Sequence, residues 1–173
     1  MTLTKFCINS LTTVLALAFS STISYAVMEE QDKLIIGWIE NVRIFPESFL
    51  MAAKIDTGAD NSSLNVSEVS EFLRDEKRWV RFAVKTVEGG TLYLEKPVVR
   101  YAKIKRKGTD PQRRPVVHFD LCVGNVYKRN VPVNLTDRSK FKFNMLIGRS
   151  FLKDSAIVDS SLTYTVEPHC LEK

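Results

Sequence analysis

The chain has 173 residues, and its 25 Lys and Arg residues only slightly outnumber its 20 Asp and Glu residues, which gives a net charge of +5. This length predicts a single domain. The basic residues are dispersed except in one stretch, so the composition does not indicate a nucleic-acid-binding protein. The mild positive charge would instead favour an anionic substrate or an anionic surface of the cell envelope.

The first 26 residues have the pattern of a secretory signal peptide. Lys5 is their only charged residue, residues 11–19 form a mainly apolar run, and residues 24–26 (Ser-Tyr-Ala) match a small-x-small cleavage site. A membrane anchor is the alternative, but the run is too short to span a bilayer comfortably. We therefore expect a mature domain of residues 27–173, with a net charge of +4, one modest core and no membrane span.

The mature chain consists of short apolar or alternating stretches separated by turn residues, a pattern that predicts an all-β domain, closed or sandwich-like. The expected strands are residues 34–42, 49–55, 61–66, 79–87, 91–94, 97–104, 115–122, 127–135, 157–159 and 162–166. Two short helices are also expected. Residues 67–73 combine a Ser N-cap with acidic residues and an apolar face, and a second helix should begin at Arg149 or Ser150 and end near Lys153.

Cysteine and histidine residues are few in the mature chain. Cys122 and Cys170 could pair in an oxidising compartment, but Cys122 lies in an apolar strand pattern, which favours two buried thiols. His118 and His169 are the only histidines, and the sequence contains no HExxH or CxxC motif and no Gly-rich phosphate loop. The residues therefore predict neither a protein-built zinc site nor a nucleotide site, and no cofactor is expected.

One apolar strand, residues 49–55, runs directly into Asp56, Thr57 and Gly58. A carboxylate at the end of a buried strand is costly unless its charge is shared, paired or hydrogen-bonded. A Gly two residues later lets the backbone fold tightly beneath it. Aspartic peptidases present a catalytic carboxylate on such a loop, although the same residues also form ordinary surface turns. We expect the loop at the tip of a hairpin made by residues 49–55 and 61–66.

The most basic stretch, residues 103–114, lies between two expected strands and predicts a long hairpin with a basic tip. A charge run of this kind is usually a solvated loop. The functional interpretation is a flap that closes over a substrate. A second hairpin, with its tip at residues 88–90, is the competing candidate for the flap.

Three stretches together resemble the retropepsin-like aspartic peptidases, whose fold is that of retroviral proteases. They are KIDTGAD at 54–60, RRPVV at 113–117 and MLIGRSFL at 145–152. The chain is similar in particular to bacterial proteins labelled ATP-dependent zinc proteases, from residue 37 to about 159. The resemblance implies an all-β, closed barrel with one or two short helices and, because it points to a Gram-negative source, a periplasmic location. The zinc and ATP of that label have no matching residues here.

The resemblance also implies roles for individual residues. Asp56 would be the catalytic carboxylate, Thr57 would hydrogen-bond across a two-fold axis, and Gly58 would lie against bound peptide. Ala59 and Asp60 would line the substrate site. Asp60 would also pair with Arg149, while Ile147 and Gly148 would support the loop from below. The flap would carry Gly108 near its tip in the substrate site and would add a basic rim that favours acidic peptides, made of Lys105, Arg106, Arg113 and Arg114.

A single Asp-Thr-Gly motif predicts a homodimer. Peptide hydrolysis by this route needs two carboxylates that share one proton, and Asp110, Asp120 and Asp159 are not followed by Thr-Gly. The second carboxylate must then come from a second copy through a two-fold interface. The sequence thus predicts an exported aspartic endopeptidase acting on peptides or proteins. The alternative is a non-catalytic module of the envelope that binds peptides or cell-wall stems.

Overall fold

The computed structural model describes residues 32–87, 89–106 and 109–170, and of residues 105, 106 and 109–111 only the strand positions. The expected signal peptide lies outside these residues. The described part is all-β apart from one short helix, and none of its helices could cross a membrane. Its elements are β1 (Leu34–Gly37), β2 (Ile39–Phe45), β3 (Phe49–Ile55), β4 (Ser62–Asn65), β5 (Ser67–Arg74), β6 (Lys77–Lys85), β7 (Thr91–Pro97), β8 (Arg100–Arg106), β9 (Thr109–Val123), β10 (Val126–Thr136), β11 (Met145–Ile147), α1 (Arg149–Leu152) and β12 (Ala156–Asp159).

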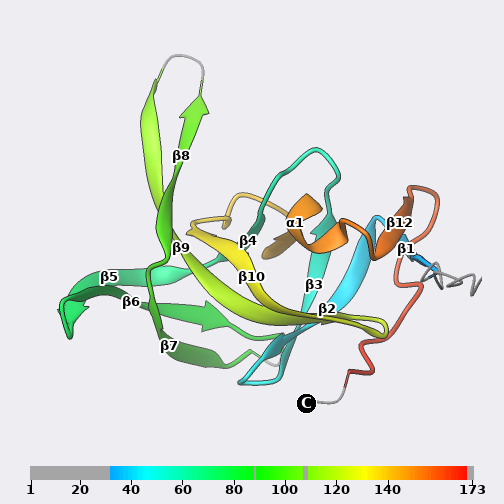
Figure 1. The fold of residues 1–173 in the computed structure, drawn as a ribbon, viewed down its shortest axis with the longest axis horizontal. Coiled ribbons are helices and arrows are strands. Elements are labelled where there is room, and N and C mark those ends of the chain that lie inside the picture. The colour runs from blue at the N-terminus through cyan, green and yellow to red at the C-terminus, as the bar shows by residue number, and fades with distance from the viewer. Residues whose placement is uncertain (1–31, 88, 107–108, 171–173) are drawn as a thin grey trace, which may run out of the picture. The chain divides into compact units, whose positions relative to one another are not determined.

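Six strands form a closed barrel in the order β10–β4–β11–β3–β2–β9, because β9 pairs with β10 as well as with β2 (Figure 1). This confirms the predicted all-β barrel. Alternation along the strands directs one row of side chains inward, where Ile55, Leu64, Val133 and Ile147 are each at most 4% exposed. Burial of such a side chain contributes about 1.5–3 kcal/mol. The remaining face of the strands is left for polar side chains.

The prediction of a hairpin around the Asp-Thr-Gly loop is wrong. β11 lies between β3 and β4, parallel to β3 and antiparallel to β4. The two strands that flank the loop therefore hydrogen-bond to a third strand from much later in the chain. A tight turn cannot join strands that stand two places apart in a sheet, so the loop is wide and rests on β11 and α1.

The prediction of a helix at residues 67–73 is also wrong, because this segment is strand β5 of a separate sheet, β5–β6–β7. A segment this short gains little from helix formation alone. In the sheet, Phe72 pairs with Trp79, and the Arg74 guanidinium lies 4.5 Å from the Trp79 ring centroid. Phe82 of β6 joins this sheet to the barrel through an edge-on contact with Phe119, with ring centroids 6.4 Å apart.

The C-terminal tail is irregular where a strand was expected at residues 162–166. The backbone N–H groups of Thr165 and Val166 donate to the carboxylate of Glu40, at 3.1 and 3.3 Å, rather than to a neighbouring strand. Glu40 is fully buried. The tail also passes within 2.4 Å of the place where a Cβ would stand on Gly37. This crossing coincides with the break of the expected strand 34–42 into β1 and β2.

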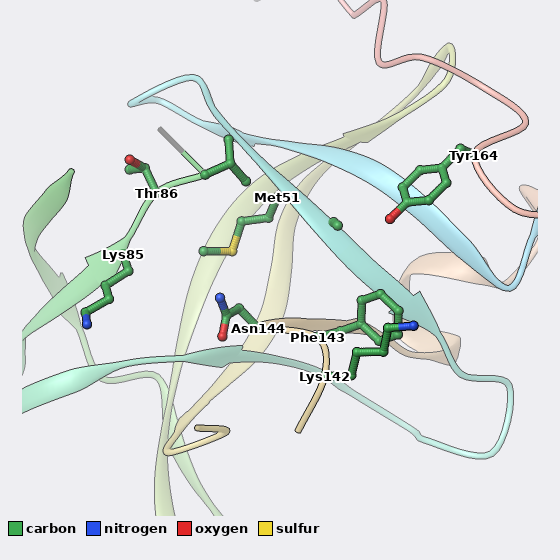
Figure 2. Close-up of a pocket in the computed structure, with 9 residues that line it drawn as sticks. Met51, Lys85, Thr86, Lys142, Phe143, Asn144 and Tyr164 are labelled. Atoms are coloured by element: carbon green, nitrogen blue, oxygen red, sulfur yellow. The ribbon is translucent and has the colours of Figure 1, made fainter. Parts of the chain in front are cut away.

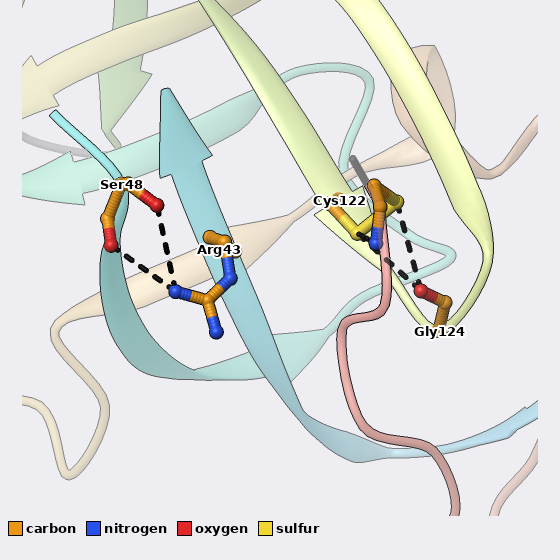
Figure 3. Close-up of a disulfide and its surroundings, with 5 residues drawn as sticks. Arg43, Ser48, Cys122 and Gly124 are labelled. Atoms are coloured by element: carbon orange, nitrogen blue, oxygen red, sulfur yellow. Dashed lines mark hydrogen bonds between the residues drawn. A yellow bond between two sulfur atoms is a disulfide. The ribbon is translucent and has the colours of Figure 1, made fainter. Parts of the chain in front are cut away.

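Cys122 of β9 forms a disulfide with Cys170, whose Cα lies 6.0 Å away (Figure 3). The prediction of two buried thiols is therefore wrong. The strand pattern around Cys122 was correctly predicted, but it says nothing about the tail, which returns to Gly124 through a bond from His169 N–H to the Gly124 carbonyl. The disulfide fixes the end of the tail to the barrel.

Replacing both cysteines by serine should test this cross-link. The bond joins residues 48 positions apart. A disulfide that closes a loop of this size typically stabilises a protein by about 2–4 kcal/mol. We expect Cys122→Ser/Cys170→Ser to lower the free energy of unfolding by about that amount in urea titrations. Reductant should lower the stability of the wild-type protein equally and leave the double variant unchanged. A wild-type protein insensitive to reductant would contradict the bond.

Candidate active site

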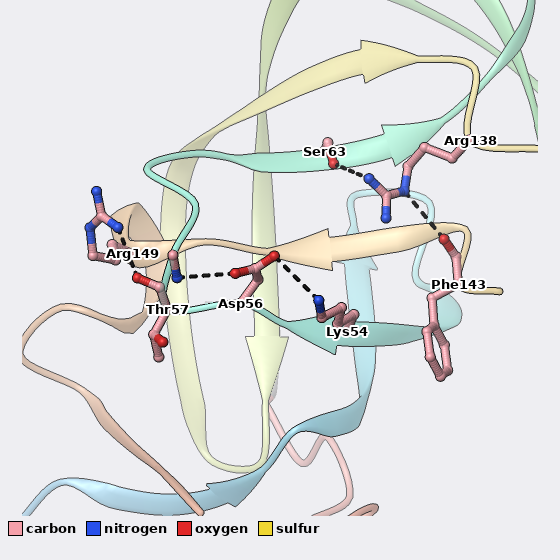
Figure 4. A network of polar contacts seen from close by, with 8 residues as sticks. Lys54, Asp56, Thr57, Ser63, Arg138, Phe143 and Arg149 are labelled. Carbon is pink, nitrogen blue, oxygen red and sulfur yellow. Dashed lines mark hydrogen bonds and ion pairs between the residues drawn. The ribbon is translucent and has the colours of Figure 1, made fainter. Parts of the chain in front are cut away.

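Asp56 lies where β3 leaves the barrel, and its side chain is 28% exposed. Its backbone N–H donates to the Ile147 carbonyl at 2.9 Å, and its Oδ1 accepts a hydrogen bond from the Gly58 N–H at 3.0 Å. The Lys54 ammonium lies 3.6 Å from Oδ2 (Figure 4). The carboxylate is thus fixed in direction and remains accessible to solvent.

The connection from β11 to α1 supports the loop from below. The backbone N–H groups of Arg149 and Ser150 donate to the carbonyls of Ala59 and Asp60 at 2.8 and 2.9 Å. Gly148 packs so closely that an added Cβ would lie 2.7 Å from the Asn61 backbone. Ile147, whose carbonyl accepts the Asp56 N–H, and Gly148 therefore lie directly beneath the loop.

The Arg149 side chain spans the same loop. Its guanidinium donates to the Thr57 carbonyl at 2.8 Å and forms an ion pair with Asp60. Both side chains of the pair are half or more exposed, so the pair itself contributes little free energy. Its effect is geometric, because one side chain holds both ends of the segment 57–60.

Thr57 and Gly58 are exposed on the outer surface of the loop, next to the Asp56 carboxylate. The structure thus leaves these residues available to a peptide or to a second copy. Asp120 and Asp159, by contrast, are engaged elsewhere. Asp120 accepts hydrogen bonds from Tyr127 and Asn130, and Asp159 from Ser161.

The two hairpins that could form the flap belong to different sheets. β8 and β9 form a hairpin that extends beyond the barrel (Figure 1), whereas the competing hairpin β6–β7 belongs to the separate sheet. In the stem of β8–β9, the Arg113 guanidinium stacks 3.5 Å from the Tyr101 ring centroid, and Arg114 donates to Gln112. The side chains of Lys105 and Arg106, and Gly108 as a whole, lie outside the described residues, so the basic tip stays a prediction.

Sequence reasoning missed Lys54, Ser63 and Arg138. Arg138 is only 7% exposed, and burial lowers the pKa of its guanidinium, with a further lowering from Arg114 that Asp56 opposes. It donates to Ser63 Oγ at 3.0 Å and to the Phe143 carbonyl at 3.2 Å (Figure 4). Its sequence context, Thr-Asp-Arg-Ser, predicted only a polar turn, because an arginine in a turn carries no local signal of burial.

Other parts of the described surface offer less chemistry. A hollow beside β3 and β6 is lined by Met51, Lys85, Phe143, Asn144 and Tyr164, among others, and contains no carboxylate (Figure 2). Among the described residues, no group of three or more His, Cys, Asp or Glu side chains is arranged to hold a metal ion. The Asp56 loop is the place where a carboxylate, exposed backbone and a positioned turn coincide.

The sequence model of the RimB-like family, described as retropepsin-like aspartic endopeptidase RimB, matches residues 35–169. The chain belongs to this family. This confirms the predicted retropepsin-like fold, while the narrower grouping with ATP-dependent zinc proteases stays a prediction.

The chain is also similar to a solved structure and to longer curated proteins. The crystal structure of a protein of unknown function from Legionella pneumophila superposes with a TM-score of 0.68 at 31% identity, covering 79% of this chain and all of that one. Proteins named probable alpha-L-glutamate ligase are 29% identical in Desulfotalea psychrophila, over 68% of this chain and 26% of theirs, and in Shewanella pealeana, over 77% and 30%. The chain thus spans less than a third of these curated relatives.

Gly148→Ala tests the support of the loop. The new Cβ would meet the Asn61 backbone at 2.7 Å, and such overpacking costs about 1–3 kcal/mol. We expect the free energy of unfolding to fall by that amount in urea titrations. Gly90→Ala is the matched control, because its Cβ meets only the flexible Thr86 hydroxyl at 3.3 Å. Equal stability of the two variants would contradict close packing at Gly148.

Proposed function

We propose that this RimB-like chain is an exported aspartic endopeptidase that acts as a homodimer, with Asp56 from each copy forming the catalytic pair. The observation that carries the proposal is the Asp56 loop itself. Its carboxylate is oriented by the Gly58 N–H and is solvent-accessible, and Arg149 braces the exposed residues beside it. A purely structural turn would not need this support.

The chemistry follows from two such carboxylates facing each other. A pair a few ångströms apart shares one proton, because both cannot remain ionised at that distance. The ionised member removes a proton from a water molecule, and the protonated member donates its proton to the carbonyl oxygen of the peptide bond. The pair then titrates as a unit with two separated pKa values. The supporting observation is that Asp120 and Asp159 are engaged elsewhere, Asp120 by Tyr127 and Asn130 of the neighbouring strand and Asp159 by Ser161.

Lys54 must leave Asp56 for this mechanism to operate. The two side chains are 46% and 28% exposed and 3.6 Å apart. Ion pairs at such exposed positions are worth about 0–1 kcal/mol. A second loop or a bound peptide could therefore displace the ammonium at little cost. If Lys54 instead stays in place, the domain fits better as a peptide-binding module, which is the second candidate function.

Export has independent support in the disulfide. Structural disulfides are typical of proteins that reach an oxidising compartment such as the periplasm, and Cys122–Cys170 fixes the C-terminal tail. This agrees with the signal-like residues 1–26. The names of the curated relatives refer to glutamate ligation, which fits the acidic peptides expected as substrates.

Asp56→Asn is the decisive variant. The asparagine cannot take a proton from water, so cleavage of a peptide library at acidic and neutral pH should fall to background. The fold should persist, because the amide oxygen can still accept the Gly58 N–H. Asp75→Asn is the matched control, since Asp75 is exposed in the turn between β5 and β6 of the separate sheet.

Sedimentation of the wild-type protein completes the test. Cleavage activity should appear at the concentrations at which dimers form. Undiminished cleavage by Asp56→Asn, or full activity in a strict monomer, would overturn the proposed mechanism.

A further inference from the structure

A row of side chains leads from Asp56 across the outer face of the barrel. Lys54 of β3 is in register with Leu146 of β11, Leu146 with Ser63 of β4, and Ser63 with Asn134 of β10. Residues in register on adjacent strands point to the same face, with strands about 4.8 Å apart. Ser63 therefore lies about 10 Å from Lys54 by strand spacing, and the row begins beside the Asp56 carboxylate.

Arg138 covers the middle of this row. Its Nη1 donates to Ser63 Oγ and its Nε to the Phe143 carbonyl, while its backbone N–H donates to Asn65 Oδ1 at 2.6 Å. The third guanidinium nitrogen, Nη2, takes neither bond and points in Figure 4 toward the side of Lys54 and Asp56. An arginine stays charged under all ordinary conditions and has five donors to satisfy.

Arg138 is unusual because it is a buried, charged side chain without a carboxylate partner among the described residues. It is 7% exposed, and among the described residues no carboxylate lies within ion-pairing distance of its guanidinium. Buried charges are costly unless they are paired. The site therefore has one desolvated positive charge that is held in place but not neutralised by a carboxylate of the described chain.

Two further polar groups on the same face lack partners. The Asn134 side-chain oxygen and the Thr136 hydroxyl are buried and accept or donate no hydrogen bond within the described part of the chain. Both residues are 7% exposed. Asn134 is in register with Ser63, and Thr136 with Asn65, so both point toward the face that Arg138 covers. Each unsatisfied buried group costs about 1–3 kcal/mol, which a ligand with matching polar atoms would recover.

We propose that Arg138, Ser63, Asn134 and Thr136 form a subsite that binds one carboxylate of the peptide substrate. The free Nη2 and the Thr136 hydroxyl supply donors for the two carboxylate oxygens, and the Asn134 side-chain oxygen, which can only accept, takes a backbone N–H of the same peptide. A single positive charge among neutral groups matches a monoanion. The carboxylate belongs to an Asp or Glu side chain or to a peptide C-terminus. That it is part of a substrate rests on the proposed peptidase function; its binding does not.

The kinetic test uses peptides that the wild-type enzyme cleaves. In matched versions, each Glu or Asp near the scissile bond is replaced by Gln or Asn, or the C-terminus is amidated. A hydrogen bond to a charged group is worth about 1.5–3 kcal/mol, so the wild-type enzyme should prefer the charged version by about 10- to 150-fold in kcat/KM. The position at which the preference appears distinguishes a side-chain carboxylate from a terminal one.

Arg138→Gln should abolish this preference, chiefly by raising KM for the charged peptide. Arg138→Lys should retain part of it, because the charge remains while the forked geometry is lost. Arg81→Gln is the matched control, since Arg81 pairs with Glu95 on the separate sheet, and its preference should equal that of the wild type. An Arg138→Gln enzyme that keeps the full preference, or a wild-type enzyme that has none, would overturn the subsite.

A binding experiment tests the carboxylate subsite independently of the proposed peptidase activity. Fluorescein-labelled (Glu-Ala)₄ and (Gln-Ala)₄ peptides are titrated into Asp56→Asn protein with and without Arg138→Gln. If the wild type cleaves nothing, selective binding of the Glu peptide that depends on Arg138 upholds the subsite alone, and equal binding of both peptides rejects it. Should Arg138→Gln fail to fold, Thr136→Val decides instead: a several-fold loss of selectivity supports the subsite, and unchanged selectivity overturns it.

Discussion

The arrangement depends on one constraint, the docking of the β11–α1 connection under the Asp56 loop. Two backbone hydrogen bonds from the first residues of α1 reach the carbonyls of Ala59 and Asp60, and the Gly148 backbone contacts Asn61 without room for a side chain. The loop cannot shift without breaking these contacts. A carboxylate at the end of β3 thereby keeps one direction although it stands at the surface.

The barrel explains why the polar side chains collect where they do. One side of β3, β11, β4 and β10 fills the core with aliphatic residues, so the opposite side of the same strands is left for Lys54, Ser63 and Asn134. The position of each on that face is set by strand register and not by the loops. Arg138 then arrives from the segment after β10 and covers this face.

Most of the strands and the Asp-Thr-Gly loop were predictable because their signals are local: alternation, turn residues and a short motif. The errors share a different origin. β5 is a strand because Phe72 pairs with Trp79, and the tail around residues 162–166 is irregular where the N–H groups of Thr165 and Val166 donate to the Glu40 carboxylate. Arg138 was missed because its burial depends on residues 63 and 143. In each case the deciding contact lies outside the local segment that carries the sequence signal, and for Glu40 and Thr165 the two residues are 125 positions apart.

The insertion of β11 between β3 and β4 has a consequence for folding during synthesis. Arg149 and Asp60 are separated by 89 residues, so the loop cannot acquire its supported shape until nearly the whole chain is present. Contacts of such long range form slowly and late. A nascent chain would therefore carry the Asp-Thr-Gly residues in an unsupported form. For the proposed peptidase, this delay would keep the candidate site incomplete until the chain has folded.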